Sequence, residues 1–154
     1  MMTYNRFQGD PAVRLKNGGA SMQFIDGQPV MDQGLENAVQ ISLFTKKGWW
    51  GNFLFKNENQ KIGSDYQEIR TIIDLQTIND YTDAGKKALE WMTKTKLAKQ
   101  IDVVVTNPLG YQIQTKIYIA PPGHDVNELL FTKNGLNWLS QSSSPAHKRF
   151  TNDL

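Results

Sequence analysis

Few side chains in this chain of 154 residues have the chemistry that catalysis or metal binding requires. There is no cysteine, which excludes disulfides, thiolate nucleophiles and thiolate metal sites. The two histidines, His124 and His147, lie beside proline, glycine and serine, and no further ligands follow them at the spacing of a metal site. The pattern therefore predicts two solvated histidines, no metal and no cofactor.

Carboxylates are the remaining candidates, because glycoside hydrolysis needs only a pair of them about 5–9 Å apart. The candidates are Glu36, Glu58, Asp65, Glu68 and Asp74. Each also fits a surface position or the first turn of a helix, where a negative charge stabilises the helix dipole. We therefore expect a protein that is not an enzyme, and we keep a glycoside hydrolase as the alternative.

Composition and charge give no indication of a protein that binds nucleic acid or a membrane. A net charge of +2 is too small to predict binding to nucleic acid or to an anionic membrane. No apolar run approaches the length of about 20 residues that a membrane-spanning helix needs. The first residues lack the apolar core of a signal peptide, so we expect a protein that folds in a cytoplasm.

The most unusual segment is Gly48-Trp49-Trp50-Gly51, which Phe53 follows closely. Two adjacent indoles are costly to leave in water, and the flanking glycines let the backbone either bury or present them. Because aromatic side chains concentrate binding energy at interfaces, we predict that Trp49, Trp50 and Phe53 bind a protein partner. The alternative is that at least one tryptophan fills the core.

Capping residues and apolar periodicity place the helices that would hold this segment. Asp32 predicts an N-cap for a helix over residues 33–45, and Thr77 predicts one for the longest helix, over 78–96. Ser64-x-x-Gln67 resembles a capping box and predicts a shorter helix that includes Tyr66. Gly85 within the long helix predicts a close packing contact there.

Alternating apolar residues and turn dipeptides place the strands. Asp26-Gly27 predicts a tight hairpin over residues 21–31, and Asn134-Gly135 predicts a second strand pair within 128–139. A hairpin over 101–119 turns at 107–110. The sequence thus predicts one α+β domain over 1–139, with a small, mainly antiparallel sheet, two main helices and one shorter helix. A polar tail over 140–154 follows.

The hairpin over 101–119 has one apolar and one polar side. Ile101, Val103, Val105, Tyr111, Ile113, Ile117 and Ile119 share the apolar parity. The opposite side is polar and would face water or a partner, while a free strand edge could pair with another chain. We therefore add Tyr111, Gln112, Gln114 and Lys116 to the predicted protein-binding residues.

Several blocks of residues follow one another in a characteristic order. The first block runs from Gly34-Leu35 through Ala38-Val39 to Ile41-Ser42-Leu43-Phe44-Thr45. It is followed by Gly48-Trp49-Trp50-Gly51, Gly63-Ser64, Ala84, Ala88-Leu89, Trp91 and Ile101-Asp102-Val103. This order resembles the small baseplate wedge proteins, or sheath initiators, of Mu-like contractile-tailed phages. The likeness covers about Met22 to Ile119. It departs from the family in its short Lys46-Lys47 spacer and in Asp65-Tyr66-Gln67, where Arg-Leu-Trp is usual.

This resemblance implies a structural wedge domain in the tail baseplate of a virion, assembled in the host cytoplasm. Its expected partners are the larger baseplate wedge proteins and the tail sheath protein, and in addition tail tube or hub proteins. Multiple copies would be present in the assembly. Because some relatives have carried a lysozyme label, a tail-associated lysozyme-like enzyme stays the alternative, with a free-standing adaptor or regulator as a third class.

Overall fold

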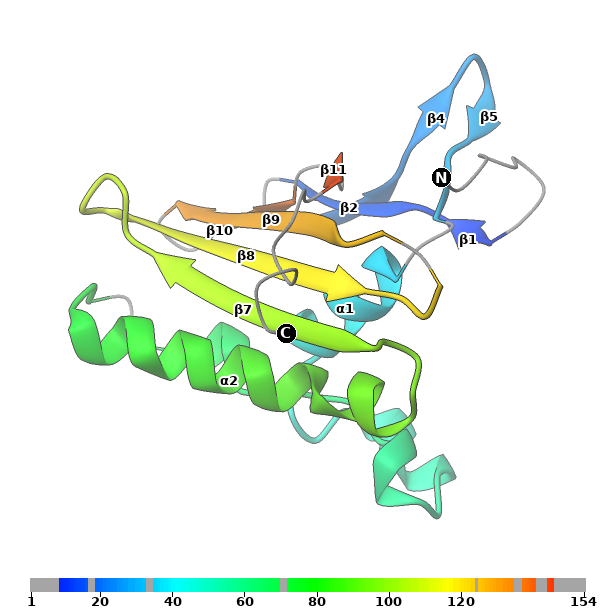
Figure 1. Ribbon diagram of the computed structural model, residues 1–154, viewed down its shortest axis with the longest axis horizontal. Coiled ribbons are helices and arrows are strands. Elements are labelled where there is room, and N and C mark those ends of the chain that lie inside the picture. The colour runs from blue at the N-terminus through cyan, green and yellow to red at the C-terminus, as the bar shows by residue number, and fades with distance from the viewer. Residues whose placement is uncertain are drawn as a thin grey trace.

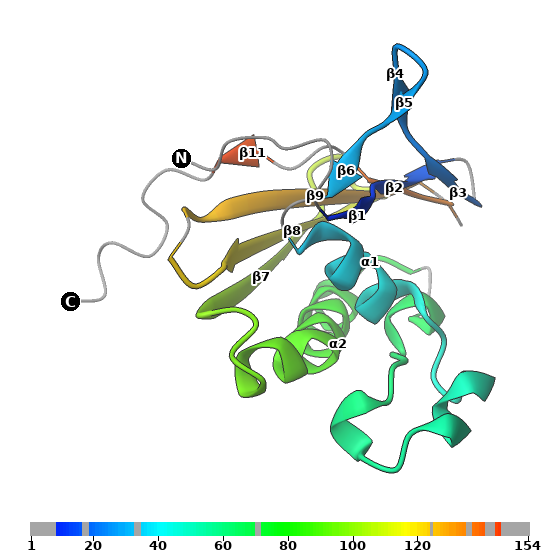
Figure 2. The same cartoon turned by 90° about the vertical axis from the view of Figure 1, so that its right-hand side faces the viewer.

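The computed structural model describes residues 9–16, 19–32, 35–69, 72–123, 125–134, 137–140 and 144–145. The main sheet contains β7 (Gln100–Thr106), β8 (Gln112–Ala120), β9 (Asn127–Asn134) and β10 (Asn137–Ser140), in the order β10-β9-β8-β7 with antiparallel pairing. The helices α1 (Glu36–Phe44) and α2 (Leu75–Lys94) lie on the same side of this sheet (Figure 1, Figure 2). Two helices and antiparallel sheets confirm the α+β class.

The register of β7 and β8 confirms the predicted hairpin. Val103 lies opposite Ile117, and Ile101 lies opposite Ile119. Because side chains alternate across a strand, this register points the apolar residues toward the helices. Tyr111 is an exception, since it precedes β8 and is 68% exposed, so its predicted place on the apolar side is wrong. The strand pair β9–β10 also forms where it was predicted.

The long helix α2 begins one turn earlier than predicted. The carboxylate of Asp74 accepts a hydrogen bond from the Thr77 backbone N–H at 2.7 Å, so Asp74 is the N-cap. Thr77 is buried inside the first turn, and its hydroxyl donates to the Ile72 carbonyl at 2.5 Å. The predicted contact at Gly85 is confirmed, because a Cβ atom there would lie 3.1 Å from Val103 Cγ1.

The first helix is shorter than the predicted range of 33–45, whose first two positions lie outside the described residues. Asp32 belongs to β6 (Met31–Asp32), and Leu35 occupies the N-cap position. Asp32 nevertheless stabilises the helix start, because its Oδ2 accepts the Asn37 backbone N–H at 2.7 Å. A carboxylate from the preceding strand thus reaches an amide that the helix itself leaves without a partner.

The predicted shorter helix is a single 3₁₀ turn, η3 (Tyr66–Glu68). The reason is that Ser64 is used elsewhere: its backbone forms a parallel bridge with Lys46, and its hydroxyl donates to the Leu43 carbonyl at 2.7 Å. Its Oγ still accepts the Tyr66 N–H at 3.3 Å, so a weak cap remains. The turn serves to place Tyr66 in the core.

Short strands precede α1. These are β1 (Asp10–Pro11), β2 (Val13–Lys16), β3 (Gly19–Met22), β4 (Phe24–Ile25), β5 (Gln28–Pro29) and β6. The turn at Asp26 and Gly27 is confirmed by positive φ values of 50° and 74°. The predicted strand over 21–25 is divided, however, because β3 pairs with β2 and only β4 pairs with β5.

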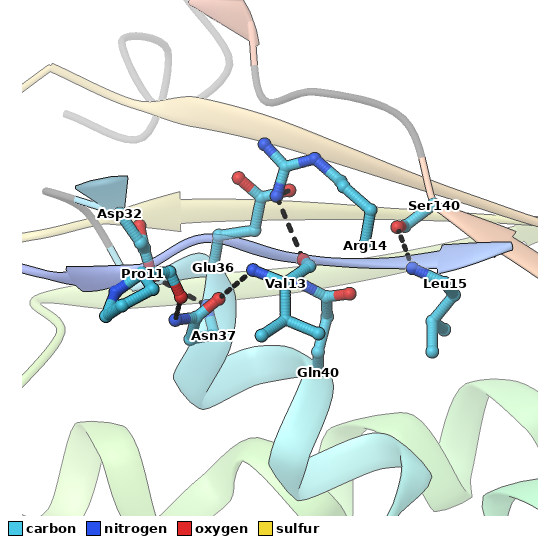
Figure 3. Close-up of polar contacts among 9 residues, drawn as sticks. All are labelled: Pro11, Val13, Arg14, Leu15, Asp32, Glu36, Asn37, Gln40 and Ser140. Carbon is cyan, nitrogen blue, oxygen red and sulfur yellow. Dashed lines mark hydrogen bonds and ion pairs between the residues drawn. The ribbon is translucent and has the colours of Figure 1, made fainter. Parts of the chain in front are cut away.

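Side chains of α1 hold β2 in place (Figure 3). Asn37 accepts the Val13 N–H at 3.1 Å and donates to the Pro11 carbonyl at 2.9 Å, while Gln40 donates to the Val13 carbonyl at 2.8 Å. Arg14 Nη1 lies 2.7 Å from Glu36 Oε1, and both side chains are largely buried. The three hydrogen bonds satisfy backbone groups of Pro11 and Val13.

The end of the predicted domain is also part of the sheet. Ser140, the first residue of the predicted tail, ends β10, and its Oγ accepts the Leu15 N–H at 2.8 Å (Figure 3). Farther along, β11 (Ser144–Pro145) pairs with β9 at Glu128 and Asn127. The boundary between domain and tail therefore does not fall at residue 140.

Five aromatic side chains from five different elements meet in the core. We call them the inner aromatic cluster: Phe44, Tyr66, Tyr81, Phe131 and Trp138. Their ring centroids lie between 5.2 Å and 5.9 Å apart in the contacting pairs, which is the range of favourable aromatic packing. The buried Tyr66 hydroxyl is hydrogen-bonded to Thr115 Oγ1.

Candidate functional site: an exposed aromatic loop

Between the two helices the chain leaves the domain at Lys46 and returns at Ser64. We call residues 46–64 the aromatic loop; it projects from the helical side of the molecule (Figure 2). Its base is closed by two backbone hydrogen bonds, Ser64 N–H to Thr45 O at 2.9 Å and Lys47 N–H to Ser64 O at 3.2 Å. Gly63 permits this closure, because its φ is 130° and a Cβ atom would lie 2.8 Å from the Lys46 carbonyl oxygen.

One side chain ties the two limbs of the loop together. The Asn52 amide donates to the Ile62 carbonyl at 2.7 Å, and its Oδ1 accepts the Ile62 N–H at 2.9 Å. Asn52 lies in the 3₁₀ turn η1 (Trp50–Leu54), and a further turn, η2 (Glu58–Gln60), precedes Ile62. The loop is therefore held by hydrogen bonds between its two limbs.

The aromatic side chains of this loop are exposed. Trp50 is 71% and Phe53 is 76% exposed, and their ring centroids lie 6.2 Å apart. Trp49 is 36% exposed and packs on Gly51, where a Cβ atom would lie 2.1 Å from its ring. Neither tryptophan belongs to the core, so the alternative expectation that one of them fills it is wrong. Leu54 and Phe55 add to the exposed apolar surface.

Two ion pairs lie at the base of the loop. Lys46 Nζ is 2.7 Å from Glu68 Oε1, and Lys47 Nζ is 3.2 Å from Asp65 Oδ2. The hydrogen bond and the charge of Glu68 raise the pKa of Lys46. Because all four side chains are exposed, these pairs add little to stability, but they join the start of the loop to η3.

All five carboxylates that we considered for catalysis make structural contacts. Asp65 and Glu68 pair with the lysines at the loop base, Glu36 contacts Arg14, Glu58 pairs with Lys61, and Asp74 caps α2. Among the described residues no group of three or more acidic, histidine or cysteine side chains is arranged to hold a metal ion. His124 and His147 lie outside the described residues.

Three of the four residues of the second predicted surface lie on a central strand of the main sheet. Gln112, Gln114 and Lys116 lie on β8, which is paired with β7 on one side and with β9 on the other. Their side chains form a polar row: Gln112 donates to Asn134 at 2.9 Å, and Lys116 lies 4.0 Å from Glu128. A strand from a partner can pair with this hairpin only at an unpaired strand edge. Within the described residues, the outer strand of the hairpin is β7.

The two predicted surfaces are not brought together. Figure 1 shows the aromatic loop and the turn between β7 and β8, where Tyr111 lies, at opposite ends of the molecule. The two hydrogen bonds between Asn52 and Ile62, which we call the Asn52 clamp, could not be predicted, because the two residues are ten positions apart and no sequence pattern links them. Within the described residues, no helix has the length and apolar character that crossing a bilayer requires.

Comparisons with known proteins give one distant relative. A protein of Haemophilus influenzae named Mu-like prophage FluMu protein gp46 is 26% identical over 132 residues, which cover 81% of this chain and 96% of that protein. No protein-family model and no solved structure matches this chain. The chain is thus a distant homologue of a Mu-like prophage protein.

Proposed function

We propose that this chain is a structural wedge protein of a contractile phage tail baseplate, where it acts as a sheath initiator through protein–protein contacts. The observation that carries the proposal is the aromatic loop, which holds Trp50 and Phe53 in an exposed position by hydrogen bonds rather than by burial. A rigid aromatic side chain loses little entropy on binding, so such a loop is suited to a protein interface. The distant Mu-like relative supports the phage context.

The proposed partners are the larger baseplate wedge proteins for the aromatic loop and the tail sheath protein for the free edge of β7. Aromatic burial would supply affinity at the loop. Backbone pairing along Gln100–Thr106 would supply register, because an added strand is aligned by its main-chain hydrogen bonds. The proposed role involves no reaction, and it places the protein in several copies in the virion.

Co-purification with the large wedge protein of the same gene cluster tests this proposal. We expect wild type to be retained and Trp50→Ala to be lost, with an unchanged circular dichroism spectrum. Leu75→Ala is the matched control, because Leu75 is also highly exposed but lies at the other end of α2 from the loop (Figure 1). Equal retention of wild type and Trp50→Ala would refute the role of the aromatic loop.

A dye-release assay on peptidoglycan tests the enzymatic alternative. We expect no activity above that of a heat-denatured sample. Sustained release that is abolished by Glu68→Gln would overturn the structural role.

A further inference from the structure

A groove lies behind the aromatic loop, between its returning limb and the C-terminal end of α2. It has a volume of about 430 Å³ and is lined by Gln60, Lys61, Ile62, Trp91, Thr95 and Leu97. Its apolar part consists of Ile62, Trp91 and Leu97, and the last of these is 39% exposed. A groove of this size can accept one or two large apolar side chains from another molecule.

The walls of the groove are fixed before anything binds. The Trp91 indole N–H donates to Ser42 Oγ at 2.9 Å, and that hydroxyl donates to the Ala38 carbonyl at 2.8 Å, so α1 holds the ring in position. On the opposite side, the Asn52 clamp holds the backbone of Ile62. A preformed site avoids much of the entropic cost of binding.

The chain next to the groove carries excess positive charge. Its lining residues belong to two segments, 58–62 and 90–99, which contain four lysines and two glutamates, and Lys96 stands between the lining residues Thr95 and Leu97. Both glutamates are used locally, since Glu58 pairs with Lys61 and Glu90 pairs with Lys94. Lys96 and Lys99 are exposed and have no ion-pair partner among the described residues. The excess charge is as large as that of the whole chain, which is +2.

The backbone beside the groove adopts a conformation that lysine rarely takes. Lys96 has a φ of 61° just after the end of α2, where glycine is the usual residue. The Ala98 N–H to Met92 O bond of 3.0 Å and the Lys99 N–H to Ala120 O bond of 2.7 Å hold the turn. The backbone conformation at position 96 favours glycine, so the lysine stands there at a cost in backbone strain. Its positive charge complements the dipole of α2 and adds to the charge beside the groove.

We propose that this groove binds an acidic amphipathic segment of a partner protein. The apolar side chains of that segment would enter between Ile62, Trp91 and Leu97, and its carboxylates would face Lys96 and Lys99. Charge complementarity selects the acidic partner over a basic one. A nucleic acid fits less well, because the groove floor is partly aliphatic and the Trp91 N–H is already used. The inference rests on the proposed assembly role only in taking the partner to be a protein.

Binding of synthetic probes to the full-length protein tests this inference. The probe is a fluorescein-labelled amphipathic helical peptide with leucines on one face and glutamates on the other. Fluorescence anisotropy measures its binding. Its matched control has each glutamate replaced by lysine, and unlabelled oligothymidylate is added as a competitor. We expect the acidic peptide to bind, to weaken as salt is raised, and to shift the Trp91 indole N–H signal in ¹⁵N spectra of the wild type.

Variants then locate the site. We expect Leu97→Gln, and separately the pair Lys96→Gly with Lys99→Gln, to weaken the acidic peptide by about tenfold or more. The pair Lys86→Gln with Lys87→Gln removes the same charge from an exposed part of α2 outside the groove and should have little effect. The ¹⁵N shift needs no variant, so it decides the result even if a substitution unfolds the protein.

Any of three results would overturn the inference. The acidic and basic peptides could bind with equal affinity, the acidic peptide could leave the Trp91 indole N–H signal unchanged, or oligothymidylate could displace the peptide. Because these probes do not include the wedge protein, the outcome is separate from the co-purification test. Failure here with successful co-purification removes only the groove, and the reverse result removes only the baseplate role.

Discussion

Two groups of aromatic side chains begin a few residues apart in the chain, at Phe44 and at Trp49, and end in opposite environments. The inner aromatic cluster is built from α1, η3, α2, β9 and β10, so each ring meets rings that are distant in sequence. The aromatic loop collects Trp49, Trp50 and Phe53 within one short segment, where the rings contact mainly each other. A group of rings from a single loop cannot surround itself, and a large part of its surface therefore stays in contact with water.

The difference also separates stability from binding. Removing a ring from the inner cluster leaves a cavity among tightly packed neighbours, which costs folding energy. Removing one from the loop exposes no core and should change only what the surface can bind. The energetic contributions of the two groups can therefore be measured independently by substitutions in each.

The largest difference is expected for the same truncation made in each group. Phe131→Ala should lower the free energy of unfolding by about 3–5 kcal/mol, because Phe131 is 1% exposed and contacts the ring of Phe44. Phe53→Ala should change it by no more than about 0.5 kcal/mol. Urea unfolding followed by circular dichroism gives both values. A comparable loss in both variants would show that the loop is part of the cooperative core.

Lys133 offers a second way to probe the inner cluster. It is a buried cation whose Nζ donates to the Tyr81 hydroxyl at 2.7 Å and lies 5.4 Å from the centroid of the Tyr81 ring. Replacing it with Met should raise the free energy of unfolding by on the order of 2 kcal/mol, since an apolar side chain of similar length pays no desolvation cost. Lys86→Met is the exposed control, and thermal unfolding near neutral pH compares them.

The pH dependence of the same variant gives an independent measurement. Burial lowers the pKa of Lys133, so the unfolded chain binds this proton more tightly and folding stability rises as the pH increases toward the ordinary value of 10.5. Burial raises the pKa of Tyr81 to about 12 and also raises that of Tyr66, which lowers stability above the ordinary value of 10.0. The Lys133→Met variant keeps both tyrosines, so its stability should still fall at high pH, but it should not rise as the pH increases toward 10.5. If the stability of wild type and variant rises equally over this range, Lys133 is not the cause.

Asn52→Ala tests whether the loop is held by its clamp. The change removes two hydrogen bonds to Ile62, and we expect a loss of about 1–2 kcal/mol in the free energy of unfolding. Retention by the wedge protein should also fall, although every aromatic side chain is still present. Amide hydrogen exchange of residues 50–62 should increase. If exchange is unchanged, the ordering of the loop has another cause.

Lys96→Gly should have the smallest effect and the opposite sign. Relief of the left-handed conformation at position 96 should stabilise the protein by up to about 1 kcal/mol, offset in part by the entropy of glycine in the unfolded chain. The matched change Lys94→Gly replaces the last residue of α2, which pairs with Glu90, and it should destabilise the protein by up to about 1 kcal/mol. Thermal unfolding distinguishes them, and destabilisation by Lys96→Gly would mean that its side chain supports the fold.

Much of the fold was predictable because its signals are local. The alternation in β7 and β8, the Asp26-Gly27 turn and the close contact at Gly85 in α2 were predicted from residue periods and dipeptides that depend on neighbouring residues alone. Helix starts were less accurate, since Asp74 and Thr77 both have capping side chains and only the extended backbone of Asp74 shows which one is used. The strand β2 was not predicted: it pairs with β3 and is also held by the side chains of Asn37 and Gln40, which lie 24 and 27 positions from Val13.

The candidate site divides in the same way. The sequence showed the aromatic residues of the loop and the glycines that let the backbone bend beside them. It did not show that both indoles are exposed. The Asn52 clamp, the Ser64 bridge to Lys46 and the groove beside Trp91 each join residues at least ten positions apart. Each of these contacts occurs once in the chain, so no periodicity in the sequence predicts it.

By itself the sequence determined the class of the fold, the position of its main hairpin and helices, and the aromatic segment most suited to binding. Only the tertiary structure decided which aromatic side chains are buried. Burial depends on the number of other elements that converge on a ring, and this is a property of the folded chain rather than of the residue type. Few elements converge on Trp49 and Trp50, so both tryptophans are exposed although their exposure to water is costly.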